Sequence, residues 1–89
     1  MLEPYRRTDV FTEDTVPAGL LRDHRTRAGV WGRIVVESGC LVLTTAGGEQ
    51  VRLGAGDVHL VRPQERHAVT PVGAVAFYVE FCREVEPPP

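Results

Sequence analysis

The chain has 89 residues and a formal net charge of −2, with 43% hydrophobic and 25% charged residues. This length and composition are typical of one small globular domain. The charge balance offers no attraction for nucleic acid or an anionic membrane, and no apolar run approaches the roughly 20 residues of a membrane-spanning helix. The first residues, MLEPYRRTDV, lack the apolar core of a signal peptide, which predicts a cytoplasmic protein.

Turn-forming residues recur about every ten positions, and short runs rich in valine, leucine, isoleucine and aromatic residues separate them. This pattern predicts an all-β sandwich or barrel. The expected strands are Arg6–Phe11, Gly19–Asp23, Val30–Glu37, Cys40–Thr45, Glu49–Leu53, Val58–Val61, His67–Thr70 and Val75–Arg83. Tight hairpins with glycine at positive φ are expected at Ser38-Gly39 and Gly47-Gly48. We predict one domain over residues 1–84 and a proline-rich, disordered tail over residues 85–89.

A glycine turn, an apolar strand and a polar loop precede His67 in the stretch GAGDVHLVRPQERHAV. In the apolar strand, Val58 and Leu60 are expected to point inward, which turns His59 outward. The loop contains Pro63 and leads directly to His67 at the start of the next strand. This arrangement can aim the imidazole of His67 into a barrel, where it would contact a metal or a ligand.

The last expected strand holds a carboxylate among apolar and aromatic residues. Phe77, Val79 and Phe81 share one side of this strand, and Glu80 lies on the other side with Tyr78. A covered carboxylate needs a cation, a metal or a hydrogen-bond donor. Glu80 is therefore a candidate site residue.

With about eight short strands and this central stretch, the chain resembles the cupins, whose fold is a double-stranded β-helix, or jelly-roll, barrel. Gly56 and His67 have the spacing of the first glycine and the histidine in the second cupin motif. When Gly39 is taken as the last glycine of the first motif, the glutamate position falls on Gly32 and the paired histidine positions fall within Arg25–Ala28. The resemblance therefore implies a cupin fold without the usual three-histidine, one-glutamate metal site.

A narrower similarity covers nearly the whole chain. The segment RDHRTRAGVWGR at residues 22–33, Gly56, residues 63–67 and the closing FYVEF at residues 77–81 are similar to the small YeaR/TehB-like cupins. This resemblance implies a compact bacterial single-domain cupin, commonly a homodimer, whose tellurite-resistance label states a phenotype rather than a reaction. It does not imply methyltransferase activity, because the chain has no glycine-rich strand-to-helix nucleotide motif.

Three residues are the candidate metal ligands: His24, His67 and Glu80. Neutral histidine binds Zn, Fe, Ni or Mn, and two histidines with one carboxylate form many non-haem iron sites. Each residue also has a structural alternative. His67 could only hydrogen-bond at the barrel mouth, His24 could be a solvated residue among charges, and Glu80 could form a salt bridge with Arg33.

The leading hypothesis is a cupin that binds a divalent metal at the barrel mouth, linked to a tellurite, oxyanion or nitrosative stress response. Arg33 and Tyr78 are expected to line a pocket for a small or anionic molecule. One alternative is a metal-free module that binds a small molecule or an anion, and another is a structural homodimer without catalysis. The residues alone leave open whether the chain is an enzyme.

Overall fold

The computed structural model describes residues 1–22 and 24–86. Within these residues the chain forms a six-stranded antiparallel sheet and a short 3-10 helix. The elements are β1 (Leu2–Arg7), β2 (Phe11–Thr12), η1 (Ala18–Leu21), β3 (Trp31–Thr45), β4 (Gln50–Gly54), β5 (Val58–Val61) and β6 (His67–Glu84). The all-β prediction is confirmed. None of the helical structure in the described residues is long and apolar enough to cross a membrane.

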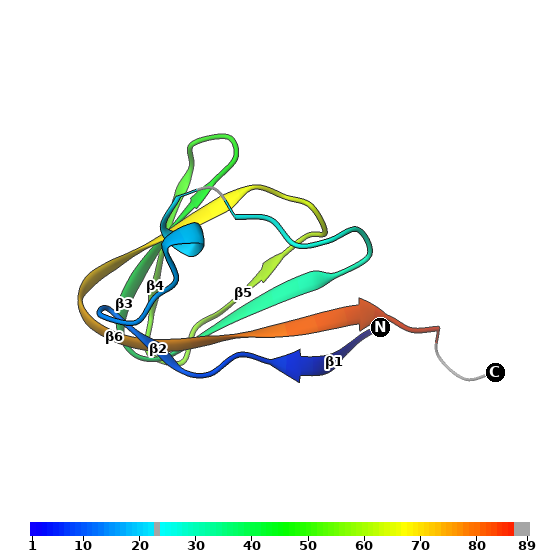
Figure 1. Ribbon diagram of the computed structural model, residues 1–89, viewed down its shortest axis with the longest axis horizontal. Coiled ribbons are helices and arrows are strands. Elements are labelled where there is room, and N and C mark those ends of the chain that lie inside the picture. Colours follow the sequence, from blue (N-terminus) through cyan, green and yellow to red (C-terminus); the bar gives the residue numbers. More distant parts are fainter. Residues whose placement is uncertain (23, 87–89) are drawn as a thin grey trace.

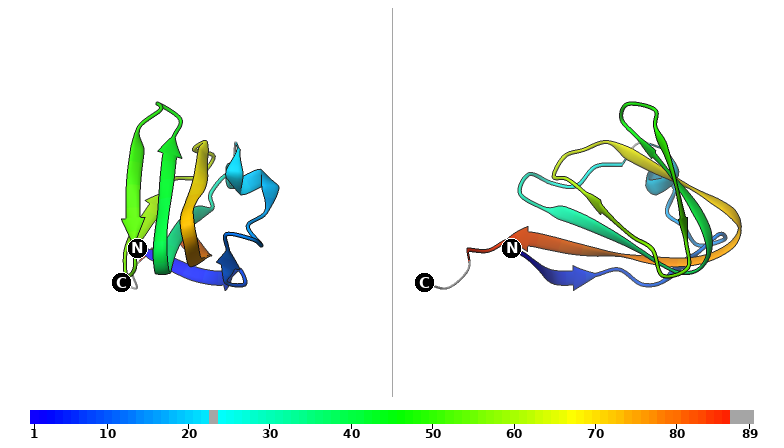
Figure 2. Two further views of the ribbon diagram at one scale, coloured as in Figure 1. Left: turned by 90° about the vertical axis from the view of Figure 1, so that its left-hand side faces the viewer. Right: turned by 180° about the vertical axis from the view of Figure 1, so that it is seen from behind.

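Two long strands, β3 and β6, pair with each other along almost their whole length and bend together. The first half of β3 also pairs with β5, and its second half pairs with β4. On the other side of β6 the sheet continues with β1 and β2. Figure 1 shows the result as a folded sheet, closed where β3 and β6 turn and open at the opposite end. The left view of Figure 2 shows β4 beside the bent pair at the closed end.

The bend depends on Gly39 in β3. Its φ is 80°, a left-handed conformation that favours glycine, and a Cβ at this position would overlap the carbonyl oxygen of Ala74 in β6. The pairing register shifts between Val36 and Ser38 and again between Gly39 and Leu41. Across these bulges the buried positions of β3 change from even-numbered to odd-numbered residues, so both halves of the strand face one core.

Eight strands are expected and six are observed, mainly because two pairs of expected strands each form one continuous strand. The third and fourth expected strands are the two halves of β3, and the last two are the halves of β6. The hairpin expected at Ser38-Gly39 is therefore wrong, because a glycine at positive φ serves a bulge as well as a turn. The hairpin at Gly47-Gly48 is confirmed, and the N–H of Gly48 donates to the carbonyl of Thr45 at 3.0 Å.

The N-terminal region also differs from expectation. The strand expected at residues 19–23 is the 3-10 helix η1, whose first turn closes when Leu20 N–H donates to the Pro17 carbonyl at 3.0 Å. A short apolar run does not distinguish a strand from a helical turn, which explains the error. Asp23 lies outside the described residues, as do residues 87–89 of the expected tail. Within the tail, Val85 N–H donates to the Met1 carbonyl at 2.9 Å.

The core fills the inside of the folded sheet. Phe77 is fully buried there, and its ring meets that of Phe11 edge to face with 5.7 Å between the centroids. Both halves of the bent pair contribute to this core, so its burial favours the closed form of the sheet. The buried members are Leu20, Ile34, Val36, Leu41, Leu43, Leu53, Val61, Val69, Val75, Phe77 and Val79.

The expected faces of β5 are wrong. Val58 and Leu60 are 52% and 46% exposed, whereas Val61 is buried and His59 is half-buried. His59 pairs with the buried Ile34, so the odd-numbered residues of β5 face the core. In four residues of similar hydrophobicity the alternation is too weak to show which face is buried.

The homodimer expected from the sequence stays a prediction.

Candidate functional site

Two histidines from distant parts of the sequence lie side by side. His24 follows η1, His67 begins β6, and their backbones form an isolated antiparallel bridge. Each N–H donates to the other residue's carbonyl, at 2.8 and 2.9 Å. The imidazole centroids are 5.2 Å apart with 78° between the ring planes. The structure therefore brings together two of the three ligands predicted from the sequence.

His67 is only 6% exposed, and the polar loop before β6 sets its position. In that loop Gln64 has a positive φ of 61°, and Glu65 N–H donates to the Arg62 carbonyl at 3.2 Å. Nδ1 of His67 lies 3.1 Å from the carbonyl oxygen of Glu65. Because a carbonyl oxygen only accepts, Nδ1 carries a proton, and in the neutral ring Nε2 keeps a lone pair for a bound group.

Burial determines the charge of His24. Its Nδ1 is a buried atom that has no hydrogen-bond partner among the described residues. Burial lowers the pKa of His24 below its ordinary value of 6.5, and the neighbouring His67 lowers this pKa further. His24 is therefore neutral at pH 7 and has a nitrogen that a bound group could satisfy.

The depressed pKa of His24 predicts a pH dependence of stability. In the unfolded chain His24 takes up a proton as the pH falls through about 6.5, whereas in the folded protein it does so only at a lower pH. The free energy of unfolding therefore has its full value above about pH 6.5 and decreases as the pH falls toward the pKa of the folded state. His24→Gln removes this titration and should flatten the fall in the free energy of unfolding just below pH 6.5. Urea denaturation at several pH values measures this, with His59→Gln as the control. An unchanged slope in His24→Gln would contradict the assignment.

An apolar cavity of about 190 Å³ lies beside the two imidazoles. Inward-facing residues of several elements line it, among them Phe11, Leu20, Ile34, Val61 and Val79. Because these side chains are apolar, the histidines supply polar contacts that can orient a ligand in the cavity.

Thr26 ties the segment containing His24 to the loop before His67. The Thr26 hydroxyl donates to the Val30 carbonyl at 2.7 Å and accepts from Gln64 N–H at 3.3 Å. Its side chain also lines the cavity and is 7% exposed. These two hydrogen bonds fix the position of the segment containing His24 relative to the loop before His67.

The other predicted site residues lie on the opposite face of the sheet. Arg33 Nη1 donates to Glu80 Oε1 at 3.4 Å, and these residues are cross-strand partners with side chains 29% and 22% exposed. The guanidinium of Arg7 lies 4.6 Å from the ring centre of Tyr78. Their strand neighbours line the cavity, but Arg33, Glu80 and Tyr78 do not. The structure confirms the salt-bridge alternative for Glu80 and does not bring it to the histidines.

The histidine pair alone supplies part of a metal site. Among residues 1–22 and 24–86, no group of three or more His, Cys, Asp or Glu side chains could hold a metal ion. The pair offers two imidazole ligands, one fewer than the three protein ligands of a typical catalytic zinc site. It fits a metal only when a bound molecule supplies further donors.

Of two further cavity residues, Gly32 has a recognisable sequence signal and Thr26 has none. Gly32 interrupts a strand of bulky residues, WGRIVV, and a glycine within a strand often marks a close approach or a space for a ligand. A Cβ on Gly32 would meet Val61 at 3.6 Å and Thr26 at 3.7 Å, so the missing side chain leaves room at the cavity wall. The role of Thr26 depends on a contact with Gln64 that no local pattern shows.

The folded sheet and its inner cavity define an all-β cupin domain. A family model described as the TehB-like domain matches residues 6–79. The chain therefore belongs to the TehB-like domain family, which confirms the resemblance found in the sequence. No curated protein gives a significant match.

Solved structures show the same fold. A protein from E. coli strain K12 is similar with a TM-score of 0.86 at 20% identity, over 96% of this chain and 93% of that one. TehB from Haemophilus influenzae has a TM-score of 0.84 at 23% identity, over 93% of this chain but 32% of TehB. A cupin protein from Bacteroides fragilis has a TM-score of 0.65 at 16% identity, over 90% and 69% of the two chains.

A further structure of the same fold contains Fe(II). Fe(II) HppE in complex with substrate is similar with a TM-score of 0.60 at 17% identity, over 84% of this chain and 43% of that one. At such identities the similarity establishes the fold. The chain spans about a third of TehB, so TehB as a whole is not a model for its activity.

Proposed function

We propose that this cupin binds a small, mainly apolar molecule in its inner cavity, with His24 and His67 contacting the polar group of that molecule. The observation that carries the proposal is the apolar cavity that His24 and His67 both line, and His24 also has a buried Nδ1 without a partner among the described residues. Buried polar atoms are normally hydrogen-bonded, so a ligand group is a suitable partner.

The size of the cavity supports the same proposal. An apolar cavity of about 150 Å³ in another protein binds benzene, and this one has about 190 Å³. It can therefore hold a benzene-sized group. His67 presents Nε2 as an acceptor because Nδ1 is bound to the Glu65 carbonyl, which suits a hydroxyl or similar donor on the ligand.

A divalent metal is the second candidate occupant. The specific observation in its favour is that both imidazoles are buried or half-buried, and that His24 is neutral and therefore able to ligate a metal. The Nδ1 contact of His67 with Glu65 is the kind of hydrogen bond that orients a ligating histidine. When bound, Zn, Fe, Ni or Mn would act as a Lewis acid toward a molecule in the cavity. Whichever of the two occupants binds, a role in an oxyanion stress response stays a prediction.

The test uses 2-phenylethanol as the probe and protein dialysed against a chelator. We expect calorimetric binding to wild type, and about fivefold weaker binding to His67→Ala, because one neutral hydrogen bond contributes about 1 kcal/mol. His59→Ala removes a half-buried histidine outside the cavity lining and should bind like wild type.

The same titration repeated with added Zn²⁺ or Fe²⁺ separates the two candidates. Binding that requires the metal, and that His67→Ala abolishes, would replace the first candidate by the second. A failure of the probe to bind with and without metal would contradict both.

A further inference from the structure

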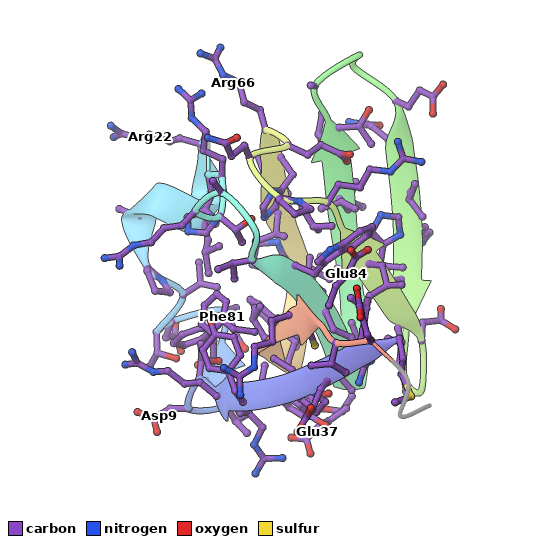
Figure 3. All side chains as sticks on the ribbon, turned by 90° about the vertical axis from the view of Figure 1, so that its right-hand side faces the viewer. Asp9, Arg22, Glu37, Arg66, Phe81 and Glu84 are labelled. Atoms are coloured by element: carbon purple, nitrogen blue, oxygen red, sulfur yellow. The ribbon has the colours of Figure 1, made fainter. Side chains whose placement is uncertain are left out.

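A second, basic hollow adjoins the inner cavity, and we call it the vestibule. It has a volume of about 310 Å³ and lies between β1 and the segment that leads into β3. His24, Thr26 and Phe81 line both the vestibule and the cavity, so these residues border both spaces. Figure 3 shows Phe81 between β1 and the η1 region, on the side of the molecule where the sheet is open.

The vestibule carries a local positive charge although the whole chain is at −2. Three arginines line it: Arg6, Arg25 and Arg27. No aspartate or glutamate is among its described lining residues, and none of these arginines forms an ion pair with a described residue. Guanidinium groups bind carboxylates and related anions through paired hydrogen bonds. The vestibule is therefore suited to an anion.

We propose that the ligand of this domain is an amphipathic monoanion, with an apolar group in the inner cavity and a carboxylate or similar anionic group in the vestibule. This inference rests on the proposed function and adds the charge and its position. The molecule would pass between His24 and Phe81, where the apolar lining gives way to the arginines. His24 lines both spaces and is therefore placed to contact the anionic end or an atom beside it.

Three probes separate the contributions of the two spaces. Phenylacetate has both the ring and the charge, 2-phenylethanol has the ring without the charge, and acetate has the charge without the ring. Calorimetry at pH 7.5 and low ionic strength should show phenylacetate binding at least tenfold more tightly than either of the others. The advantage over 2-phenylethanol should shrink as salt is added, because the arginines are exposed to solvent.

A matched pair of double variants locates the anion site. Arg25→Gln with Arg27→Gln should weaken phenylacetate binding about tenfold and leave 2-phenylethanol binding within twofold. Arg52→Gln with Arg62→Gln removes the same charge from exposed positions outside both spaces, and should leave both affinities unchanged. Loss of phenylacetate binding in this control would show a general charge effect and overturn the proposal.

The remaining outcomes distinguish this inference from the proposed function. Equal affinities for phenylacetate and 2-phenylethanol would overturn the anion site while leaving the apolar cavity as a binding site. Acetate binding as tightly as phenylacetate would show that the inner cavity is not used, and would overturn the amphipathic ligand. Absence of binding by all three probes would overturn this inference together with the proposed function.

Discussion

Gly39→Ala should lower the free energy of unfolding by about 3 kcal/mol or more. The left-handed conformation contributes about 1–2 kcal/mol of this loss, because φ at Gly39 is 80°. Overlap of the new Cβ with the Ala74 carbonyl adds a packing cost of about 1–3 kcal/mol. The two strands cannot separate locally without disturbing the bend that closes the sheet over its core. Urea denaturation followed by tryptophan fluorescence measures the change.

Gly48→Ala is the matched control. Gly48 has a φ of 85°, but a Cβ there would meet nothing within 4 Å. This variant should therefore lose only the conformational contribution of about 1–2 kcal/mol. Equal losses in the two variants would show that the close approach of Gly39 to β6 has no energetic role, and would contradict this account of the bend.

Substitutions at Gly32 should close the inner cavity in steps. A Cβ at this position would meet its neighbours at 3.6–3.9 Å, which are ordinary contact distances, so Gly32→Ala should fold normally. It should gain about 0.4–1 kcal/mol from the reduced freedom of the unfolded chain. Gly32→Val fills more of the roughly 190 Å³ and should weaken 2-phenylethanol binding at least tenfold. Calorimetry and urea denaturation on the same samples measure both effects.

Gly47→Ala is the control, because it reduces the freedom of the unfolded chain without changing the cavity. Gly47 lies in the exposed β3–β4 hairpin. Among the described atoms, a Cβ at Gly47 would meet only Thr45 Oγ1 within 4 Å, at 4.0 Å. The variant should bind the probe like wild type. Unchanged affinity in a folded Gly32→Val would place the probe outside the cavity and remove the main support for the proposed function.

Much of the fold was predictable because its signals are local. Alternating apolar residues and regularly spaced glycines indicated an all-β domain, and the spacing from Gly56 to His67 indicated a cupin. The continuity of β3 was not predictable, since the conformation of Gly39 fits a turn or a bulge and only its approach to Ala74 decides between them. Residue patterns within one strand do not contain that long-range contact.

The sequence identified the two histidines of the candidate site, and it showed less of their surroundings. His67 was found from its spacing and His24 from its place before the Trp31 strand, and the structure joins them through a backbone bridge. Glu80 was suspected because it lies among apolar neighbours, but Arg33 on the adjacent strand neutralises it. The register of β3 against β6 determines that pairing, and neither strand shows it alone.

The position of a bound probe tests the central claim most directly. With 2-phenylethanol added to metal-free, isotope-labelled protein, NMR should show the largest shifts for the methyl groups of Ile34, Val61 and Val79 and for the ring nitrogens of His24 and His67. Shifts confined to the exposed Val58 and Leu60 on the outer face, or no shifts at saturating probe, would contradict binding in the inner cavity.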